Sequence, residues 1–232
     1  MIDMSEIRST AAIEPQPPTV YGVLLNDRAT HQRMEAAFHG APYKAPPKAP
    51  VLYIKPVNTH VAPGAQVRVP ADPGVVQVNP TLGLVLGRAA TRVGVDDALT
   101  FVAGCRIACD LSLPHESVYR PAIRQRCRDG FLPMSEVLPL ADSLSIEQLQ
   151  VRTFVNEVEV DRRDFSSLVR PLAQLLADVT AFMTLDAGDV MLLGGADRSP
   201  LARAGDVVRV EVEGLGSLSF QLVAESVQGD QA

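Results

Sequence analysis

Two polar side chains lie in an otherwise apolar segment, VVQVNPTLGLVLGRA, which predicts a buried strand ending in a glycine turn. Asn79 and Thr81 are separated by one residue, so on a strand they share one face. Alternating side chains of this kind can direct two ligands at one metal ion. Because the two side chains are an amide and a hydroxyl rather than carboxylates, three interpretations remain open. The pair is a polar patch in a core, a weak metal site, or a site that has lost its metal.

Arginine is unevenly distributed in this chain, which has 3 Lys and 18 Arg. The segment YRPAIRQRCRDGF carries four of them, Arg120, Arg124, Arg126 and Arg128. Arginine suits bidentate recognition of carboxylates, so this group could clamp the distal carboxylates of a diacid. The alternatives are a solvated face paired with Asp129 and Glu116, or an interface to a partner.

Three further groups could bind a ligand or move a proton. Lys55, in YIKP, ends an apolar strand and could reach a substrate carboxylate, although a lysine at a strand end is more often exposed. His31 and Glu35 are four positions apart on an expected helix and so share a face. Such a pair can activate water or transfer a proton, or it can be a plain surface pair. His115 beside Glu116 is the second candidate acid–base pair.

The cysteines give no sign of a zinc site or a redox motif. Cys105, Cys109 and Cys127 form no CxxC pair, and no histidine stands at zinc-finger spacing from them. We therefore expect small buried residues in a reducing compartment.

Many short strands and few helices are expected. The strands are predicted at 19–26, 51–56, 64–70, 74–87, 105–113, 149–163 as a hairpin turning near Asn156-Glu157, 188–195, 205–216 and 217–225. Helices are predicted at 27–40, 94–104 and 166–185, with Asp27 capping the first and Pro171 in the first turns of the last. Because strands and helices do not alternate, this order predicts a mainly β or α+β fold.

Composition limits the class of protein. The chain has 232 residues, 47% of them hydrophobic, and a net charge of −6, which argues against nucleic-acid binding. There is no apolar run of membrane-spanning length and no secretory signal, so we expect a cytoplasmic protein. We expect a loose N-terminal arm (1–18), a strand, short helix and proline-rich connection (19–50), and a catalytic-type domain (51–226).

Four segments together resemble the fumarylacetoacetate hydrolase superfamily. They are LGLVLGRAATRVGVDDALTFVAGCRIACDLS, YRPAIRQRCRDGFLP, LQVRTFVNEVEV, and LDAGDVMLLGG followed by AGDVVRVEVEGLG. The resemblance implies an α+β, mainly β fold: a mixed-sheet β-roll of the C-terminal-domain type of that family, usually dimeric or pseudo-dimeric.

The YRPxIRxRxRDGFxP segment resembles one branch of the family, which acts in 4-hydroxyphenylacetate (homoprotocatechuate) breakdown. That branch decarboxylates 5-oxopent-3-ene-1,2,5-tricarboxylate and isomerises 2-hydroxyhepta-2,4-diene-1,7-dioate. Two family modules occur in it, fused or as separate subunits, and this chain resembles the first, N-terminal or G1-type module.

The resemblance also implies a divalent cation, Mg²⁺ or Mn²⁺, held by a Glu-x-Glu pair and an Asp. A hard cation chelated by the substrate carboxylate and its 2-oxygen withdraws electron density from the bond being altered. The two glutamates fall on Asn79 and Thr81, and the third ligand on Asp110. With two of three carboxylates absent, a structural or pocket role for Asp110 is favoured over a complete metal site.

Other departures from the family pattern agree. A lysine of the family corresponds to Arg126, which keeps the charge but does not readily transfer a proton. The polar turn after GDV reads Leu193-Gly194-Gly195 here, so a hydroxyl that would hold a substrate carboxylate is missing.

Three functions therefore remain open. The first is a subunit of the decarboxylase/isomerase acting on a small dicarboxylate or tricarboxylate, as a homodimer or with a sister subunit. The second is a catalytically degenerate partner of a metal-bearing sister subunit. The third is an acylpyruvate-type C–C hydrolase, against which the missing glutamates count most.

Overall fold

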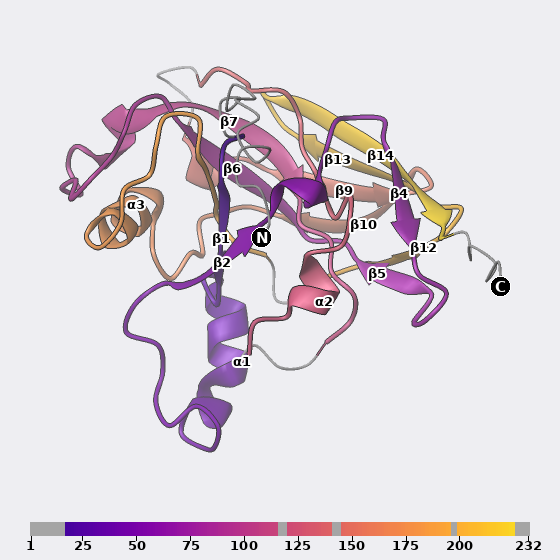
Figure 1. The fold of residues 1–232 in the computed structure, drawn as a ribbon, viewed down its shortest axis with the longest axis horizontal. Coiled ribbons are helices and arrows are strands. Elements are labelled where there is room, and N and C mark those ends of the chain that lie inside the picture. Colours follow the sequence, from indigo (N-terminus) through magenta and orange to yellow (C-terminus); the bar gives the residue numbers. More distant parts are fainter. Residues whose placement is uncertain (1–16, 116–119, 141–144, 196–198, 226–232) are drawn as a thin grey trace, which may run out of the picture.

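The structure is a computed structural model that describes residues 17–115, 120–140, 145–195 and 199–225. The first of its two five-stranded sheets has the order β2-β1-β11-β6-β7 (Figure 1). Its strands are β1 (Val20–Leu24), β2 (Val51–Lys55), β6 (Pro80–Leu86), β7 (Val102–Cys109) and β11 (Val190–Leu192). Only the β1–β11 pair in this sheet is parallel, so the sheet is mixed.

The second sheet has the order β10-β9-β13-β14-β4. Its strands are β4 (Gln66–Val69), β9 (Val151–Val155), β10 (Val158–Arg163), β13 (Val207–Val212) and β14 (Gly216–Ala224). Two small sheets pair β12 (Leu201–Arg203) with β5 (Val75–Gln77) and β3 (His60–Val61) with β8 (Leu132–Pro133). The expected mainly β, mixed-sheet α+β fold is confirmed.

Helices are few and short. The α-helices are α1 (Arg28–Phe38), α2 (Ile123–Arg126) and α3 (Leu172–Thr180), and the 3₁₀ turns are η1 (Val57–Thr59), η2 (Ala98–Phe101) and η3 (Ile146–Gln148). In Figure 1, α1 projects from the body of the molecule, whereas α3 lies at the side of the first sheet. Phe38 is the only buried residue of α1, in keeping with that exposed position.

Strand β6 reads PTLGLVL without polar alternation because both of its faces are covered. All seven of its residues are buried. Leu82 and Leu84 belong to the main core, which also contains Val208 and Val210 of the second sheet. Val85 belongs to a smaller apolar cluster on the other side of the strand. A strand buried on both faces reads as a continuous apolar run.

Two predictions about local structure are confirmed, one of a helix cap and one of a hairpin turn. Asp27 caps α1, since its side chain accepts a hydrogen bond of 2.8 Å from the backbone N–H of Thr30. The β9–β10 hairpin turns at Asn156 and Glu157, whose φ angles are 50° and 63°. Two successive positive φ angles define the turn that matches the twist of a two-residue hairpin.

Three element predictions need correction. The single strand expected at 74–87 is two strands separated by Val78 and Asn79, because β5 pairs with β12 in a small sheet whereas β6 pairs with β11 and β7 in the first large sheet. The helix expected at 94–104 is only η2, since β7 already begins at Val102 and pairs with β6. The helix expected at 166–185 is limited to α3, with Pro171 as its N-cap. A proline disfavours helical geometry in the residue before it.

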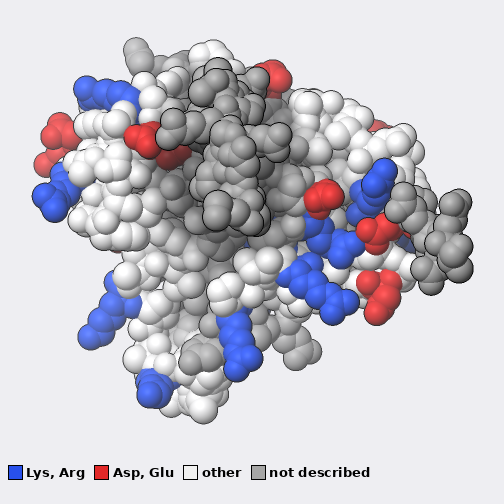
Figure 2. Space-filling view, in the orientation of Figure 1, with Lys and Arg blue, Asp and Glu red and all other residues white. Residues whose placement is uncertain are grey.

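No helix among the described residues is long and apolar enough to cross a membrane. On the face shown in Figure 2, acidic and basic side chains lie near one another at the left and right sides of the view, and the lower part shows basic side chains only. This face therefore presents both signs of charge.

Candidate functional site

The site lies where side chains of strand β2 reach the residue that follows β7. Tyr53 and Lys55 alternate on β2 and so point to one side of the sheet. Asp110 follows directly after β7 and is 3% exposed. Both side chains of β2 reach its carboxylate, so the spacing of two residues on one strand brings a phenol and an ammonium to one acid.

The carboxylate of Asp110 has partners at both oxygens. The phenol of Tyr53 donates to Oδ2 at 2.5 Å, and Nη1 of Arg126 donates to the same oxygen at 2.7 Å. Nζ of Lys55 lies 2.9 Å from Oδ1 as an ion pair. Burial by itself opposes ionisation, but Lys55 and Arg126 outweigh it and hold the pKa of Asp110 below its usual value.

Lys55 is buried to 1% exposure, which contradicts a surface position for this strand-end lysine. Its ammonium also donates to three backbone carbonyls, those of Arg126 at 2.5 Å, Phe131 at 2.9 Å and Leu111 at 3.3 Å. The three carbonyls account for the three donors that an ammonium has, and Oδ1 of Asp110 lies beside the ammonium as an ion pair without a hydrogen bond of its own. Lys55 is thus an interior part of the network rather than a side chain extended toward solvent.

Tyr53 and Arg126 complete the network. Burial, and then the neighbouring Asp110, raise the pKa of Tyr53 well above its usual value, so the phenol stays a donor. Burial opposes the charge of Arg126, yet Asp110 raises the pKa of its guanidinium overall. The guanidinium also lies over the ring of Tyr53, 4.9 Å from its centroid.

Asn79, which precedes β6, and Thr81, which lies within it, both form hydrogen bonds with other groups of the protein. The amide of Asn79 donates to the backbone carbonyl of Asp110 at 3.1 Å, and its oxygen accepts from the hydroxyl of Ser199. The hydroxyl of Thr81 donates to the carbonyl of Gly194 at 2.9 Å. Their side chains therefore complete local hydrogen bonds in the core.

These residues do not fit a divalent cation. Metal binding by Asp110 would have to displace two cations, Lys55 and Arg126, from its oxygens. Thr81 already uses its hydroxyl as a donor, and Asn79 uses its oxygen as an acceptor. In the part of the chain that the structure describes, no group of three His, Cys, Asp or Glu side chains is placed to hold a metal ion. This donor set is consistent with the structural or pocket role that the sequence favours for Asp110 rather than with a complete metal site.

Two cavities adjoin the network. The smaller, of about 100 Å³, is lined by residues that include Asn79, Asp110 and Arg126. The larger, of about 400 Å³, lies between β2 and α2 and is mostly apolar. Leu24, Tyr53 and Arg126 line both, so the guanidinium stands at the boundary between them.

The four arginines of the YRPAIRQRCRDGF segment do not act as one group. Only Arg126 reaches Asp110, whereas Arg128 pairs with Glu225 at 2.9 Å. Arg120 lines the larger cavity, and Arg124 is exposed on α2. Asp129 accepts from the amide of Asn58 at 2.7 Å, and Glu116 lies outside the described residues.

None of the candidate acid–base side chains that the structure describes forms a hydrogen bond or ion pair with Asp110. Nδ1 of His31 is 3.9 Å from the carboxylate of Glu35, which also lies 3.3 Å from Nε2 of His39. The ring of His31 packs on Phe38 at 5.0 Å. Nδ1 of His115 lies 2.9 Å from the carbonyl of Leu113, and this histidine lines the larger cavity.

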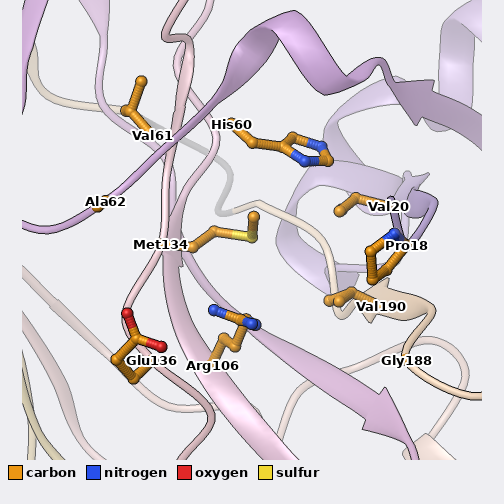
Figure 3. Close-up of a pocket in the computed structure, with 10 residues that line it drawn as sticks. All are labelled: Pro18, Val20, His60, Val61, Ala62, Arg106, Met134, Glu136, Gly188 and Val190. Atoms are coloured by element: carbon orange, nitrogen blue, oxygen red, sulfur yellow. The ribbon is translucent and has the colours of Figure 1, made fainter. Parts of the chain in front are cut away.

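Another cavity, of about 310 Å³, is drawn in Figure 3 and shares no lining residue with the two beside Asp110. His60 points into it from above Val20, while Arg106 and Glu136 lie at the opposite end. Arg106 donates to the carbonyl of Ser135 at 2.5 Å, and burial lowers the pKa of His60. None of the residues predicted from sequence to act on a ligand lines this cavity.

Sequence reasoning missed three participants. Tyr53 was not singled out, although its spacing from Lys55 on a predicted strand was visible. Ser199 reaches Asn79 from 120 positions away, which no local pattern indicates. Arg163 is partly buried and donates to the carbonyls of Pro80 and Gly194. Its desolvation lowers the pKa of the guanidinium to about 10.

Two of the three thiols are buried in the core, whereas Cys127 lines the larger cavity. The described cysteines are all free, and Cys105 and Cys109 are buried. Burial raises the pKa of Cys105 to about 11 and that of Cys109 further. Such thiols stay protonated and are poor nucleophiles.

The class of protein follows from the family that the sequence matches, and the fold agrees with it. Residues 19–223 match the model of the fumarylacetoacetate (FAA) hydrolase C-terminal family, so the chain belongs to this family. It is 40% identical over 207 residues to the 4-hydroxyphenylacetate degradation bifunctional isomerase/decarboxylase of Salmonella dublin, and 39% identical to that of Escherichia coli. The match covers 89% of this chain but 47% of either relative. The chain thus spans about half the length of the curated relatives it matches.

Solved structures agree with the family assignment. A 5-carboxymethyl-2-hydroxymuconate delta-isomerase from Mycobacterium smegmatis is 28% identical, with a TM-score of 0.76 over 91% of this chain and 80% of that one. A fumarylpyruvate hydrolase from Pseudomonas aeruginosa, solved with Mn²⁺ and pyruvate, shares the fold with a TM-score of 0.76 at 20% identity. The match covers 90% of this chain and 91% of the hydrolase.

Proposed function

We propose that this chain is one module of a two-module isomerase/decarboxylase in 4-hydroxyphenylacetate breakdown. The reactions are isomerisation of 2-hydroxyhepta-2,4-diene-1,7-dioate and decarboxylation of 5-oxopent-3-ene-1,2,5-tricarboxylate. The identity of 40% to a relative of that name supports this assignment. The coverage of about half of that relative leaves room for a second module beside this one.

Within that assembly, this chain is the module that works without its own metal ion. The observation that carries this statement is the Asp110 carboxylate, which Lys55 and Arg126 already neutralise at 2.9 and 2.7 Å. The divalent cation, Mg²⁺ or Mn²⁺, then belongs to a sister module with an intact Glu-x-Glu pair. A hydrolase reaction on this chain alone is not favoured, because it needs a metal and a water activated on it.

The expected partner is that sister module, joined as a heteromer or a fusion, and the expected substrates are small dicarboxylates and tricarboxylates. We also place the module in the cytoplasm. Three free cysteines, two of them buried, support a reducing compartment.

The test is turnover of the hydroxy-dienedioate, followed by ultraviolet absorbance. The chain alone, the sister module alone and an equimolar mixture are each assayed with Mg²⁺ and with EDTA. We expect no Mg²⁺-dependent turnover by this chain alone and the highest rate in the mixture. Mg²⁺-dependent turnover by the chain alone that disappears in Asp110→Ala would refute the metal-free assignment.

A further inference from the structure

The cavity of about 310 Å³ drawn in Figure 3 has polar groups at its two ends and apolar walls between them. His60 lies at one end, and Arg106 and Glu136 lie at the other, with Met134 between them in the view. The cavity shares no lining residue with the two cavities beside Asp110. It is therefore a separate candidate site, with its own set of polar groups.

His60 offers a hydrogen-bond acceptor to a ligand in this cavity. Its Nε2 lies 3.0 Å from the backbone carbonyl of Lys55, which can only accept, so Nε2 carries the ring proton. Burial lowers the pKa of the ring, and the nearby charges of Lys55 and Arg106 lower it further, so the histidine is neutral at pH 7. Among the described residues, none donates a hydrogen bond to the unprotonated Nδ1. A ligand hydroxyl suits this nitrogen as a donor.

Arg106 and Glu136 place opposite charges at the other end of the cavity. Nη1 of Arg106 donates to the carbonyl of Ser135 at 2.5 Å. In the part of the chain that the structure describes, neither the half-buried guanidinium nor the exposed carboxylate of Glu136 forms an ion pair. A ligand headgroup that carries a carboxylate beside an ammonium would supply each charge with a partner. The headgroup of an α-amino acid has this arrangement.

The walls between the two ends favour a flat apolar group. Val20, Val190 and Met134 line the cavity and belong to the smaller apolar core cluster. Because they are core residues, the packing of the sheet holds these walls in place. The thioether of a methionine makes favourable contacts with aromatic rings. An aromatic ring therefore suits the space between the histidine and the charged end.

We infer that this cavity binds an α-amino acid with a hydroxyaryl side chain. The ligand carboxylate pairs with Arg106, its ammonium pairs with Glu136, and its ring hydroxyl donates to Nδ1 of His60. The site is separate from the isomerase/decarboxylase function proposed above, and its occupancy does not depend on that function. Through the carbonyl of Lys55, His60 also joins the cavity to the strand that carries part of the Asp110 network.

The probe is L-tyrosine, and three related compounds each lack one of its polar groups. L-Phenylalanine lacks the hydroxyl, tyramine lacks the carboxylate, and 3-(4-hydroxyphenyl)propionate lacks the ammonium. Binding of each compound to the full nitrogen-15-labelled chain is measured by chemical-shift titration. We expect tyrosine to bind about tenfold more tightly than tyramine, about fivefold more tightly than phenylalanine and about threefold more tightly than the propionate. Equal binding of tyrosine and any of the three, or no binding of tyrosine, would overturn the inference.

The amides that shift in the same titration locate the bound ligand. Tyrosine should produce larger shifts at Gly188 and Val190, which line this cavity, than at Leu52 and Ile54, which line the larger cavity beside Asp110. The reverse order would place tyrosine in the cavity beside Asp110 and would reject the site proposed here.

Variants identify the groups that bind the ligand. Glu136→Gln changes an exposed side chain and should weaken tyrosine binding about threefold, but it should leave binding of the propionate unchanged because that compound has no ammonium. Arg106→Gln should weaken binding of both compounds about tenfold, whereas Arg124→Gln, exposed on α2, should change neither. If Arg106→Gln does not fold, Glu136→Gln decides: unchanged tyrosine binding, or equal losses for both compounds, contradicts the proposed headgroup contacts.

Discussion

Replacing Lys55 by Met tests whether the Asp110 network supports the fold. Methionine keeps the length and apolar stem of lysine but removes the ammonium. Asp110 then loses its partner at Oδ1, and the carbonyls of Arg126, Phe131 and Leu111 lose a donor. Because the site is buried, the loss is not compensated by water.

The magnitude follows from the burial of both partners. Removing one member of a buried ion pair costs about 3–5 kcal/mol. In a chain of this size, each kcal/mol lowers the melting temperature by about 2–4 °C. We therefore expect Lys55→Met to lower the free energy of unfolding by about 3–5 kcal/mol and the melting temperature by roughly 6–20 °C.

Urea denaturation followed by circular dichroism gives the free energy, and calorimetry gives the melting temperature. Lys48→Met is the matched control, because Lys48 is exposed and a surface charge contributes about 0–1 kcal/mol. A loss below about 1 kcal/mol in Lys55→Met, equal to that of the control, would refute the argument that Lys55 is an interior structural cation.

Three further predictions concern pH, a turn and the cysteines. The pKa of Asp110 is lowered in the folded state, so its contribution to stability should be fully present above its unfolded pKa of about 4 and be lost as pH falls through the folded value. Acid titration of the wild type and Asp110→Asn checks this, and identical acid profiles would contradict it. Glu157→Gly should stabilise the β9–β10 hairpin by about 1 kcal/mol, because glycine adopts a φ of 63° without strain. The lost ion pair between Glu157 and Arg209 is exposed and reduces this gain only slightly. An unchanged or lower urea midpoint would count against the strain. Iodoacetamide should label Cys127 before Cys105 or Cys109, which are buried, and mass spectrometry that finds Cys109 modified first would contradict the burial order.

Features with a local physical cause could be predicted from the sequence. The cap at Asp27 and the turn at Asn156-Glu157 follow from short-range hydrogen bonding and backbone geometry, and both are confirmed. The error at 94–104 has a long-range cause, because pairing with β6 begins β7 at Val102 in a segment that also suits a helix. Pairing partners far along the chain decide such segments, and local propensity does not contain that information.

Part of the candidate site could likewise be predicted from the sequence, and part of it could not. The amide and hydroxyl at Asn79 and Thr81, where the resemblance implies two carboxylates, can be read from the sequence. The ion pairs of Asp110 with Lys55 and Arg126 cannot, because they depend on the burial of a lysine that the sequence marks only as a strand-end residue. An apolar strand that ends in Lys-Pro gives no local sign of the carboxylate that it meets across the sheet.

The parallel pairing of β1 with β11 constrains when this module can finish folding during synthesis. Val20 of β1 pairs with Val190 of β11, so the second of these paired strands begins 170 positions after the first. At about 5–20 residues per second, ribosomes need roughly 10–30 s to deliver the second strand after the first. During that interval β1 can pair with β2, but its other edge stays open to chaperones or to wrong strands. This edge of β1 therefore has no native partner until residue 190 has been made.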